Sequence, residues 1–321
     1  MNGITNRTFY FVKPLIPRPV QIALRRRIAH YKRRKYAHVW PIDPNAAAPP
    51  PGWAGWPGGK QFAFVLSHDV DTKKGQERVL DLAALEAKFG FRSAFNFVPE
   101  RYTNHKNVKN HLRENGFEIN VHGLKHDGKD FASRSIFERR AARINQYLKD
   151  WGSDGFTSPS MHHRLEWLHT LEITHSISTF DTDPFEPQSD PVGTIFPFWV
   201  ANRHSTKGCV ELPYTLPQDH LLFVILREKN IDIWKRKLDW VAAHGGMALL
   251  NTHSDYMNFG DHPMSGEEYP VQFYESFLKY VIGRYPQGYF HALPGDIAKH
   301  CSASKACGPP PRLRVSGAQE V

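Results

Sequence analysis

Short hydrophobic runs alternate with longer segments of helical spacing from residue 62 onward. A short continuous apolar run is typical of a buried strand, whereas apolar residues three or four positions apart predict one face of a helix. The pattern predicts strands at 62–66, 93–98, 117–121, 247–251 and 289–293, and helices at 77–89, 108–115, 135–149, 232–244 and 271–284. Ser135 and Glu138 form a capping box at the start of one helix. Repeated strand–helix units predict a parallel sheet in an α/β domain.

Two regions interrupt this alternation. Residues 195–226 contain several strand-like runs without helical spacing, which indicates an insertion or an antiparallel edge. Residues 44–59 are rich in Pro, Gly and Ala, a composition that favours an extended, poorly packed connector. We therefore expect a basic N-terminal arm with its linker at 1–60, the main domain at 61–300 and a C-terminal tail at 301–321.

The net charge of +9 comes from the N-terminal arm. Residues 1–60 contain eleven Lys and Arg against one acid, Asp43, whereas the remainder contains 30 Lys and Arg against 31 acids. Residues 19–35 read as a short basic helix with some apolar surface, which could contact an anionic membrane or an acidic polymer. The alternative is a solvated helix packed loosely on the outside of the domain. No nucleic acid partner is expected.

The remaining composition points to the cytoplasm. No stretch approaches the roughly 20 apolar residues of a membrane-spanning helix, and the positive charge near the start follows a weak apolar segment, the reverse of a secretory signal. Cys209, Cys301 and Cys307 are odd in number and include no CxxC pair, so we expect reduced thiols. We expect a cytoplasmic protein, with a peripheral membrane location open through the basic arm.

Two aspartates directly follow the first predicted strand, in residues 67–71, SHDVD. Parallel α/β folds place their active sites at the carboxyl ends of strands. Because side chains alternate along an extended chain, Asp69 and Asp71 can lie on the same side and converge on one ion or water. Taken alone, the pair is more often a turn or a helix cap.

Histidines follow two further predicted strands. His122 and His126, four residues apart, can face one ion if the chain after the strand forms one helical turn. With one carboxylate they make three protein ligands, which leaves positions open for a water and a substrate, as in catalytic zinc sites. His253 ends the strand at 247–251. Each histidine alone could be structural, but three strands ending in such groups indicate one metal-hydrolase site.

These motifs resemble those of the polysaccharide deacetylase family, also called the NodB-homology or fourth carbohydrate esterase family. Its first motif, Phe-Asp-Val-Asp in one variant, corresponds to residues 67–71. Its second, His-Ser/Thr-x-x-His, corresponds to residues 122–126, with Gly123 at the hydroxyl position, and its later strand with a terminal histidine corresponds to residues 249–253. The resemblance covers roughly residues 61–298 and implies an α/β fold, a distorted (β/α) barrel with fewer than eight strands.

The resemblance implies a metal-dependent hydrolase that removes N-acetyl groups from a sugar in a polysaccharide or its precursor. It implies a divalent metal, expected to be Zn²⁺, on Asp71, His122 and His126, with Asp69 as general base and His253 as general acid. The expected substrate is an N-acetylated glycan or a lipid-linked sugar.

The resemblance also implies residues that contact the substrate. A backbone N–H near Ser160, which follows Pro159, is expected to stabilise the oxyanion, and Leu249 and Leu250 are expected to border the acetyl methyl. The family's Arg-x-Pro-Tyr-Gly motif aligns with residues 157–161, so the arginine that usually pairs with the catalytic aspartate is replaced by Thr157. Arg164 or the adjacent histidines at 162–163 could compensate.

Two other functions stay open at the level of sequence. One is an amide or ureide hydrolase of the same superfamily that acts on a non-sugar substrate, a possibility raised by the missing arginine. The other is a non-catalytic glycan-binding barrel. The complete set of acids and histidines argues against the second, because a protein that only binds glycans does not need it.

Overall fold

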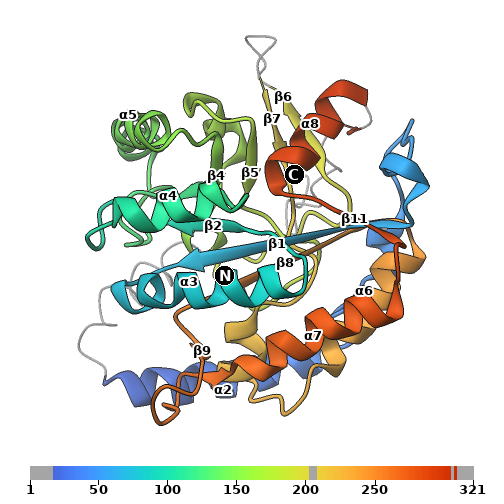
Figure 1. The fold of residues 1–321 in the computed structure, drawn as a ribbon, viewed down its shortest axis with the longest axis horizontal. Coiled ribbons are helices and arrows are strands. Elements are labelled where there is room, and N and C mark those ends of the chain that lie inside the picture. The colour runs from blue at the N-terminus through green and yellow to red at the C-terminus, as the bar shows by residue number, and fades with distance from the viewer. Residues whose placement is uncertain (1–16, 202–207, 305–306, 309–321) are drawn as a thin grey trace, which may run out of the picture.

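The computed structural model describes residues 17–201, 208–304 and 307–308, and places its helices around one curled sheet (Figure 1). The helices are α2 Arg18–Lys35, α3 Lys73–Lys88, α4 Lys106–Glu114, α5 Arg134–Trp151, α6 Asp232–Ala243, α7 Val271–Arg284 and α8 Pro294–Ser304. The strands are β1 Phe62–Val70, β2 Ala94–Phe97, β3 Glu118–His122, β4 Gly155–Thr157, β5 His175–Ile177, β6 Phe198–Ala201, β7 Gly208–Glu211, β8 Met247–His253, β9 Met257–Asn258, β10 Tyr269–Pro270 and β11 Tyr289–His291.

The main sheet has nine strands in the order β11-β1-β2-β3-β4-β5-β7-β6, with β8 paired to β1. All pairs are parallel except β6 with β7. Isolated parallel bridges join Phe180 to Tyr214 and Leu216 to Leu250, so the chain after β7 approaches the free edge of β8. This topology confirms the expected distorted (β/α) barrel, but the expected number of strands is too low. The short strands β4 and β5 and the β6–β7 hairpin add to the five strands that hydrophobic runs predicted.

The predicted strands and helices are all present, with small shifts of their ends. The cap of α5 is one correction, since the Ser133 side chain accepts a hydrogen bond from the Ile136 amide, and Ser133 rather than Ser135 is the N-cap. The antiparallel edge expected within 195–226 is confirmed by β6 and β7. The same region also contains a helical turn, η6 His220–Ile225, which its unbroken apolar run did not indicate.

The connector at 44–59 packs against the domain, so the prediction that it is poorly packed was wrong. Trp56 is 5% exposed, and its indole N–H donates to the Gly245 carbonyl at 2.8 Å. The buried Ala46 accepts a hydrogen bond from the Ile195 amide through its carbonyl. Small and aromatic side chains among the prolines and glycines therefore bury apolar surface that a free linker would expose to water.

The chain beyond β11 forms α8, which continues to Ser304, past the expected boundary at residue 300. Cys301 and Cys307 form a disulfide, with Cα atoms 5.2 Å apart. The expectation of reduced thiols was therefore wrong for this pair, while Cys209 is free and buried. Most of the expected tail, residues 309–321, lies outside the described residues.

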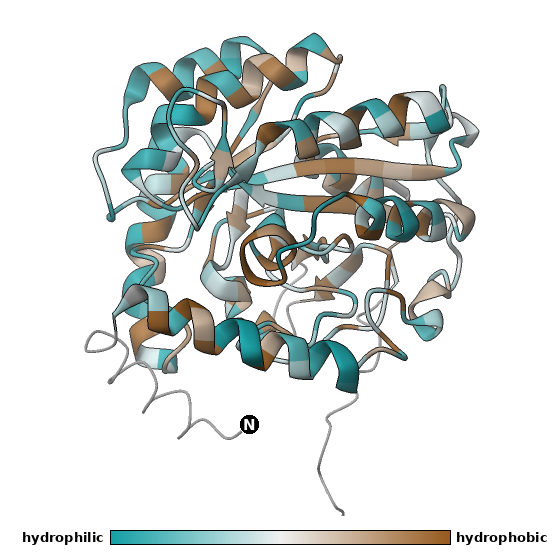
Figure 2. Ribbon diagram, turned by 90° about the horizontal axis from the view of Figure 1, so that it is seen from below, coloured by the Kyte–Doolittle hydropathy of each residue, from teal (hydrophilic) through white to brown (hydrophobic). Residues whose placement is uncertain are grey.

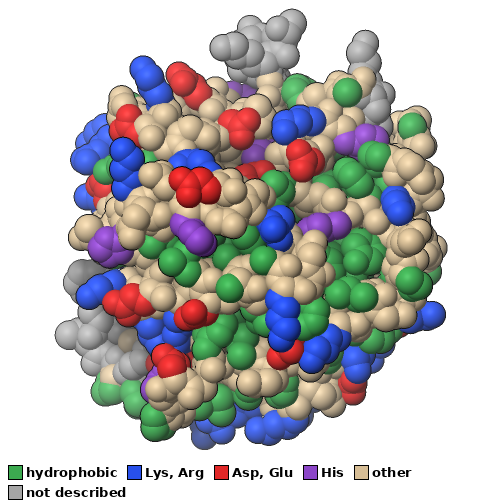
Figure 3. All heavy atoms as spheres, in the orientation of Figure 1, with side chains coloured by type: hydrophobic (Ala, Val, Ile, Leu, Met, Phe, Trp, Pro, Cys, Tyr) green, Lys and Arg blue, Asp and Glu red, His purple; other side chains and the backbone are tan. Residues whose placement is uncertain are grey.

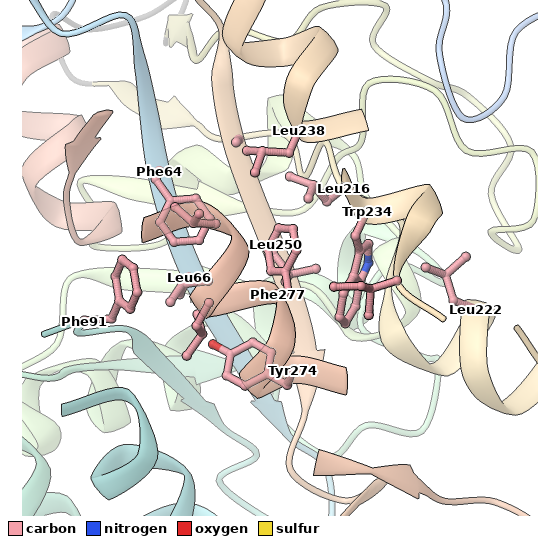
Figure 4. Close-up of a cluster of buried hydrophobic side chains, with 14 of the residues drawn as sticks. Phe64, Leu66, Phe91, Leu216, Leu222, Trp234, Leu238, Leu250, Tyr274 and Phe277 are labelled. Carbon is pink, nitrogen blue, oxygen red and sulfur yellow. The ribbon is translucent and has the colours of Figure 1, made fainter. Parts of the chain in front are cut away.

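Strand β1 runs through the centre of the hydrophobic core, and all nine of its residues are buried. Phe64 and Leu66 pack into one cluster with residues of α6 and α7, whereas Ala63 and Val65 pack into a second cluster (Figure 4). The central strands are mainly hydrophobic while the outer helices alternate in character (Figure 2). A parallel strand covered on both faces reads as a continuous apolar run, which is why this strand was found in the sequence.

None of the helices among the described residues combines the length and the hydrophobicity needed to cross a membrane.

Candidate metal and catalytic site

Three parallel strands deliver the predicted site residues to one end of the sheet. Asp69 lies near the carboxyl end of β1 and is paired in register with His253, the last residue of β8. Asp71 follows β1 directly, and His122 is the last residue of β3. Because the carboxyl ends of parallel strands meet at one edge, these four side chains lie together, and each is at most 8% exposed.

One carboxylate and two histidines form a cluster suited to a metal ion. Asp71 Oδ1 lies 3.4 Å from His122 Nε2 and 3.1 Å from His126 Nε2, and the three candidate ligand atoms are all within 4.8 Å of one another. The chain between the histidines is a bent loop with left-handed backbone at Gly123 and His126, so the expected helical turn was wrong. A Cβ on Gly123 would come within 2.5 Å of Pro159 and Asp130, which explains why a glycine replaces the family's hydroxyl residue.

Within the described part of the chain, two buried atoms of this cluster have no hydrogen-bond partner, namely Asp71 Oδ1 and His122 Nε2. Buried polar atoms are nearly always satisfied, so two unpaired buried atoms side by side fit a site that could hold a cation. The opposite ring nitrogen of His122, Nδ1, lies 3.1 Å from the Thr157 carbonyl and must donate to it, so in the neutral imidazole Nε2 carries the free lone pair. Although burial lowers the pKa of His122, the nearby carboxylates of Asp69 and Asp71 raise it, and the same negative field favours a cation.

Side-chain amides hold Asp69, for which the sequence motifs had predicted an arginine partner. Asn96 on β2 donates to Asp69 Oδ1 and Asn251 on β8 donates to Oδ2, each at 2.8 Å. Arg164 is exposed and His163 bonds to the Met161 carbonyl, so neither takes the arginine's place. Two neutral donors fix both oxygens of the carboxylate without adding a positive charge to the site. Sequence reasoning missed both asparagines as partners of Asp69, because each lies within a buried strand; Asn251 stands in the motif at 249–253, but only His253 was singled out there.

His253 is held by a second carboxylate that sequence reasoning also missed. Its Nδ1 lies 2.8 Å from Asp219 Oδ1, and its backbone amide donates to Asp219 Oδ2. The Tyr269 hydroxyl donates to the same oxygen at 3.0 Å. Burial lowers the pKa of His253, but Asp219, with smaller contributions from Asp71 and Asp69, outweighs burial and raises it to about 10. His253 is therefore an imidazolium at neutral pH, with Nε2 directed toward Asp69 Oδ2 at 3.8 Å.

Asp255 supports the metal cluster from behind. Its Oδ2 accepts a hydrogen bond from the Asp71 amide at 2.9 Å, and its other oxygen accepts from the Thr72 hydroxyl. Burial, together with the charge of Asp71, raises the pKa of Asp255 to about 6. Helix α3 approaches so closely that a Cβ on Gly75 would lie 2.2 Å from Asp255 Oδ2. A glycine is needed there for the helix and the carboxylate to share this space.

A cleft of about 1150 Å³ opens over these groups. Helix α2 forms part of its wall, so the basic helix is not packed loosely on the outside of the domain. Arg26 bonds to the Val224 carbonyl, Lys32 to the Pro184 carbonyl and Arg33 to Glu228. The lining includes Asp69, Asp71, His122, His126, Ser160, Glu186, His253 and, from α2, Ile22, Arg25, Arg26, Ile28, Ala29 and Lys32.

The four residues expected to contact the substrate differ in position. Ser160 lines the cleft in a left-handed conformation, whereas the adjacent Pro159 is buried. Leu249 and Leu250 have no exposed surface and lie in two separate hydrophobic clusters, and Figure 4 shows Leu250 among the core side chains. Neither leucine lines the cleft. These two leucines are not placed to contact an acetyl methyl as expected, because their side chains pack in the hydrophobic core.

Three acidic residues lie at 181–186, of which Asp181 and Asp183 are buried while Glu186 lines the cleft. The Tyr214 hydroxyl lies within hydrogen-bond distance of both Asp183 and Glu186. Burial, and then the charge of Glu186, raises the pKa of Asp183 to about 8. Asp181 pairs with Lys237. These acids do not contact His253, so Asp219 is the acid that orients this histidine.

Comparison with solved structures identifies the same fold in other proteins. A putative polysaccharide deacetylase from Mycobacterium smegmatis superposes with a TM-score of 0.64 at 17% identity, over 85% of this chain and 99% of that one. A probable polysaccharide deacetylase from Pseudomonas aeruginosa PAO1 has a TM-score of 0.60 at 16% identity, over 81% and 96%. Puue allantoinase has a TM-score of 0.59 at 17% identity, over 83% and 99%. No protein-family model and no curated protein matches this sequence. At these identities the similarity establishes the fold.

Proposed function

We propose that this chain is a divalent-metal-dependent hydrolase that removes an N-acetyl group from a sugar in a polysaccharide or its precursor. The observation that carries the proposal is the joint placement, at one strand edge, of a three-ligand cluster with two orphaned acceptor atoms and an acid–base pair beside it. Proteins named as polysaccharide deacetylases share the fold, which supports this class of substrate.

The cluster residues fit a divalent cation. Asp71, His122 and His126 supply one carboxylate and two imidazoles, the donor set that suits Zn²⁺ while leaving coordination positions open. When bound, such a cation supplies Lewis-acid polarisation to an amide carbonyl and favours deprotonation of water. The Thr157 carbonyl fixes the tautomer of His122 that such binding requires.

The other two residues have opposite proton-transfer roles. Asp69, with both oxygens oriented by amides, acts as the general base that takes a proton from the attacking water. His253, kept protonated by Asp219, donates its Nε2 proton to the leaving amine, since an amine leaves readily only after it gains a proton. The separation of 3.8 Å between His253 Nε2 and Asp69 Oδ2 supports these roles, because both groups can reach one reacting centre.

The proposed substrate is an N-acetylated glycan or a lipid-linked sugar, and the proposed location is the cytoplasm. A ureide or other amide hydrolase is the second candidate, because one protein with this fold is named an allantoinase and because asparagines replace the expected arginine beside Asp69. Acetate release from N-acetylhexosamine oligomers, compared with hydrolysis of cyclic ureides, distinguishes the two.

Substitution of the base tests the mechanism. We expect Asp69→Asn to retain the metal and to lose activity by a factor on the order of 100 or more, because a positioned general base contributes about that much. Acetate release is measured with metal-loaded protein, and metal content is measured on the same samples. Unchanged turnover in the variant would remove Asp69 from the mechanism, and glycan binding without turnover in the wild type would favour a binding protein.

A further inference from the structure

Helix α2 has one face fixed to the domain. Ile22 and Ala29 are 6% and 5% exposed. Arg26 donates to the Val224 carbonyl at 3.0 Å and Arg33 pairs with Glu228. At about 100° per residue, these four side chains fall on the same side of the helix. The buried side chains of Ile22 and Ala29 and the two guanidinium groups therefore fix which face of α2 is turned toward the domain.

The opposite face of α2 carries an apolar stripe. Val20, Leu24, Ile28 and Tyr31 are 55%, 46%, 48% and 60% exposed, and their spacing places them on one side of the helix. Among the described residues, they are four of the seven large hydrophobic side chains that are exposed. An amphipathic helix on a domain normally turns its apolar side inward. A contiguous exposed stripe on the outward face instead marks an interaction surface.

Cationic side chains border this stripe. Arg27 and Arg34 are exposed, and neither forms an ion pair within the part of the chain that the structure describes. Lys35 is also exposed, and the helix sequence from 18 to 35 contains no acid. Lys and Arg side chains gather along the lower edge of the molecule in Figure 3, where α2 lies in the same view of Figure 1. An apolar stripe between cations is complementary to an anionic bilayer. The apolar side chains can insert among the acyl chains, while the cations contact the phosphates of the head groups.

The stripe also borders the cleft. Ile28 belongs to it and lines the cleft, as do Arg25 and Lys32 on the adjoining side of α2. We infer that α2 is an interfacial helix that docks on an anionic phospholipid bilayer and thereby places the cleft mouth at the membrane surface. The inference that α2 docks on a bilayer rests only on the exposed stripe and the cations of this helix. Its consequence, that the glycan reaching the site is linked to a lipid, rests on the proposed function.

Vesicle sedimentation tests the docking with the full chain. Vesicles of phosphatidylcholine alone are compared with vesicles that also contain phosphatidylglycerol, at low and high salt. We expect the protein to pellet with the anionic vesicles, to pellet less with neutral ones, and to be released as salt screens the cations. The double substitution Leu24→Ser/Ile28→Ser should weaken partitioning at least about tenfold, because it removes apolar surface from the acyl boundary.

A matched control uses exposed hydrophobic residues elsewhere. Leu80 on α3 and Ile282 on α7 are 39% and 38% exposed, and Leu80→Ser/Ile282→Ser should pellet like the wild type. Circular dichroism confirms that both variants are folded. Equal pelleting of the two double variants, or no pelleting of the wild type, would overturn the inference. A wild-type dimer that becomes a monomer on Leu24→Ser/Ile28→Ser would assign the stripe to a second copy of the chain and would also overturn it. None of these readouts depends on deacetylase activity.

Discussion

Substitution of Asp219 by asparagine tests the effect of its negative charge on His253, because asparagine has nearly the same shape but no charge. The carboxylate holds His253 in place through Nδ1 and the backbone amide, and it is the largest of the charges that raise the pKa of the imidazole to about 10 from an ordinary 6.5. Asparagine keeps an oxygen that can accept from Nδ1 but removes the negative charge. Since burial lowers the pKa of His253 and only the charges of Asp71 and Asp69 still raise it, the pKa in Asp219→Asn should fall toward its ordinary value of 6.5.

The size of the effect follows from the protonated fraction of His253. At pH 8 an imidazole with a pKa of about 10 is protonated in about 99% of molecules, whereas one with a pKa of 6.5 is protonated in about 3%. If His253 is the general acid, kcat/KM of Asp219→Asn should be up to about thirtyfold below wild type at pH 8 and less than about twofold below it at pH 6. Wild-type activity should persist as the pH rises toward 10, while variant activity declines above about 6.5.

Acetate release measured from pH 6 to pH 9, with metal saturation checked at each pH, gives the required profile. Tyr269→Phe serves as the control, because it removes one hydrogen bond to Asp219 but leaves the charge in place. A loss in Asp219→Asn that is equal at pH 6 and pH 8 would refute the reasoning, since it would show that Asp219 acts on structure and not on the protonation of His253.

Three further results are expected. Asn251→Leu should retain the metal but lower kcat/KM about tenfold or more in acetate release, because the amide donates directly to Asp69; an unchanged kcat/KM would exclude this positioning role. Gly75→Ala should lower the free energy of unfolding by about 1–3 kcal/mol in thermal or denaturant melts, because its Cβ would overlap Asp255. Gly283→Ala on α7, where the new Cβ meets no atom within 4 Å, should be neutral or stabilising; equal loss in both would contradict the packing argument.

The parts of the fold that sequence predicts are those with strong periodicity or a continuous apolar run. Strand β1 is buried on both faces, so it could be recognised from composition alone, and α7 was predicted with its observed ends. The connector was misjudged because Pro and Gly set its composition, while Trp56 sets its packing. The turn η6 was missed because an apolar run buried on all sides has no polar face to show its period.

The residues of the candidate site also fall into those that the sequence could predict and those that it could not. Asp69, His122 and His253 follow recognisable strands, so their convergence could be predicted from parallel pairing. Asp219 lies just before η6, in a segment with no readable period, and only the packing of that segment on β8 brings it to His253. Asn96 reaches Asp69 through the register of β2 against β1, which no single-chain pattern reveals.

The position of α2 shows a further limit. Its basic composition was visible, but a charge run gives no sign of which surface the helix will contact. Two of the contacts that hold α2 beside the cleft are made to the backbone carbonyls of Val224 and Pro184. Every residue has a backbone carbonyl, so the sequence cannot indicate which of them a side chain will contact.

Metal content tests the central claim most directly. Elemental analysis of the purified protein, before and after addition of zinc, is compared with the His122→Ala/His126→Ala variant, and acetate release is measured on the same samples. The account predicts close to one divalent ion per wild-type chain, acetate release by that protein, and loss of both in the variant. Absence of metal from the wild type even after zinc addition, or equal metal in both proteins, would contradict it.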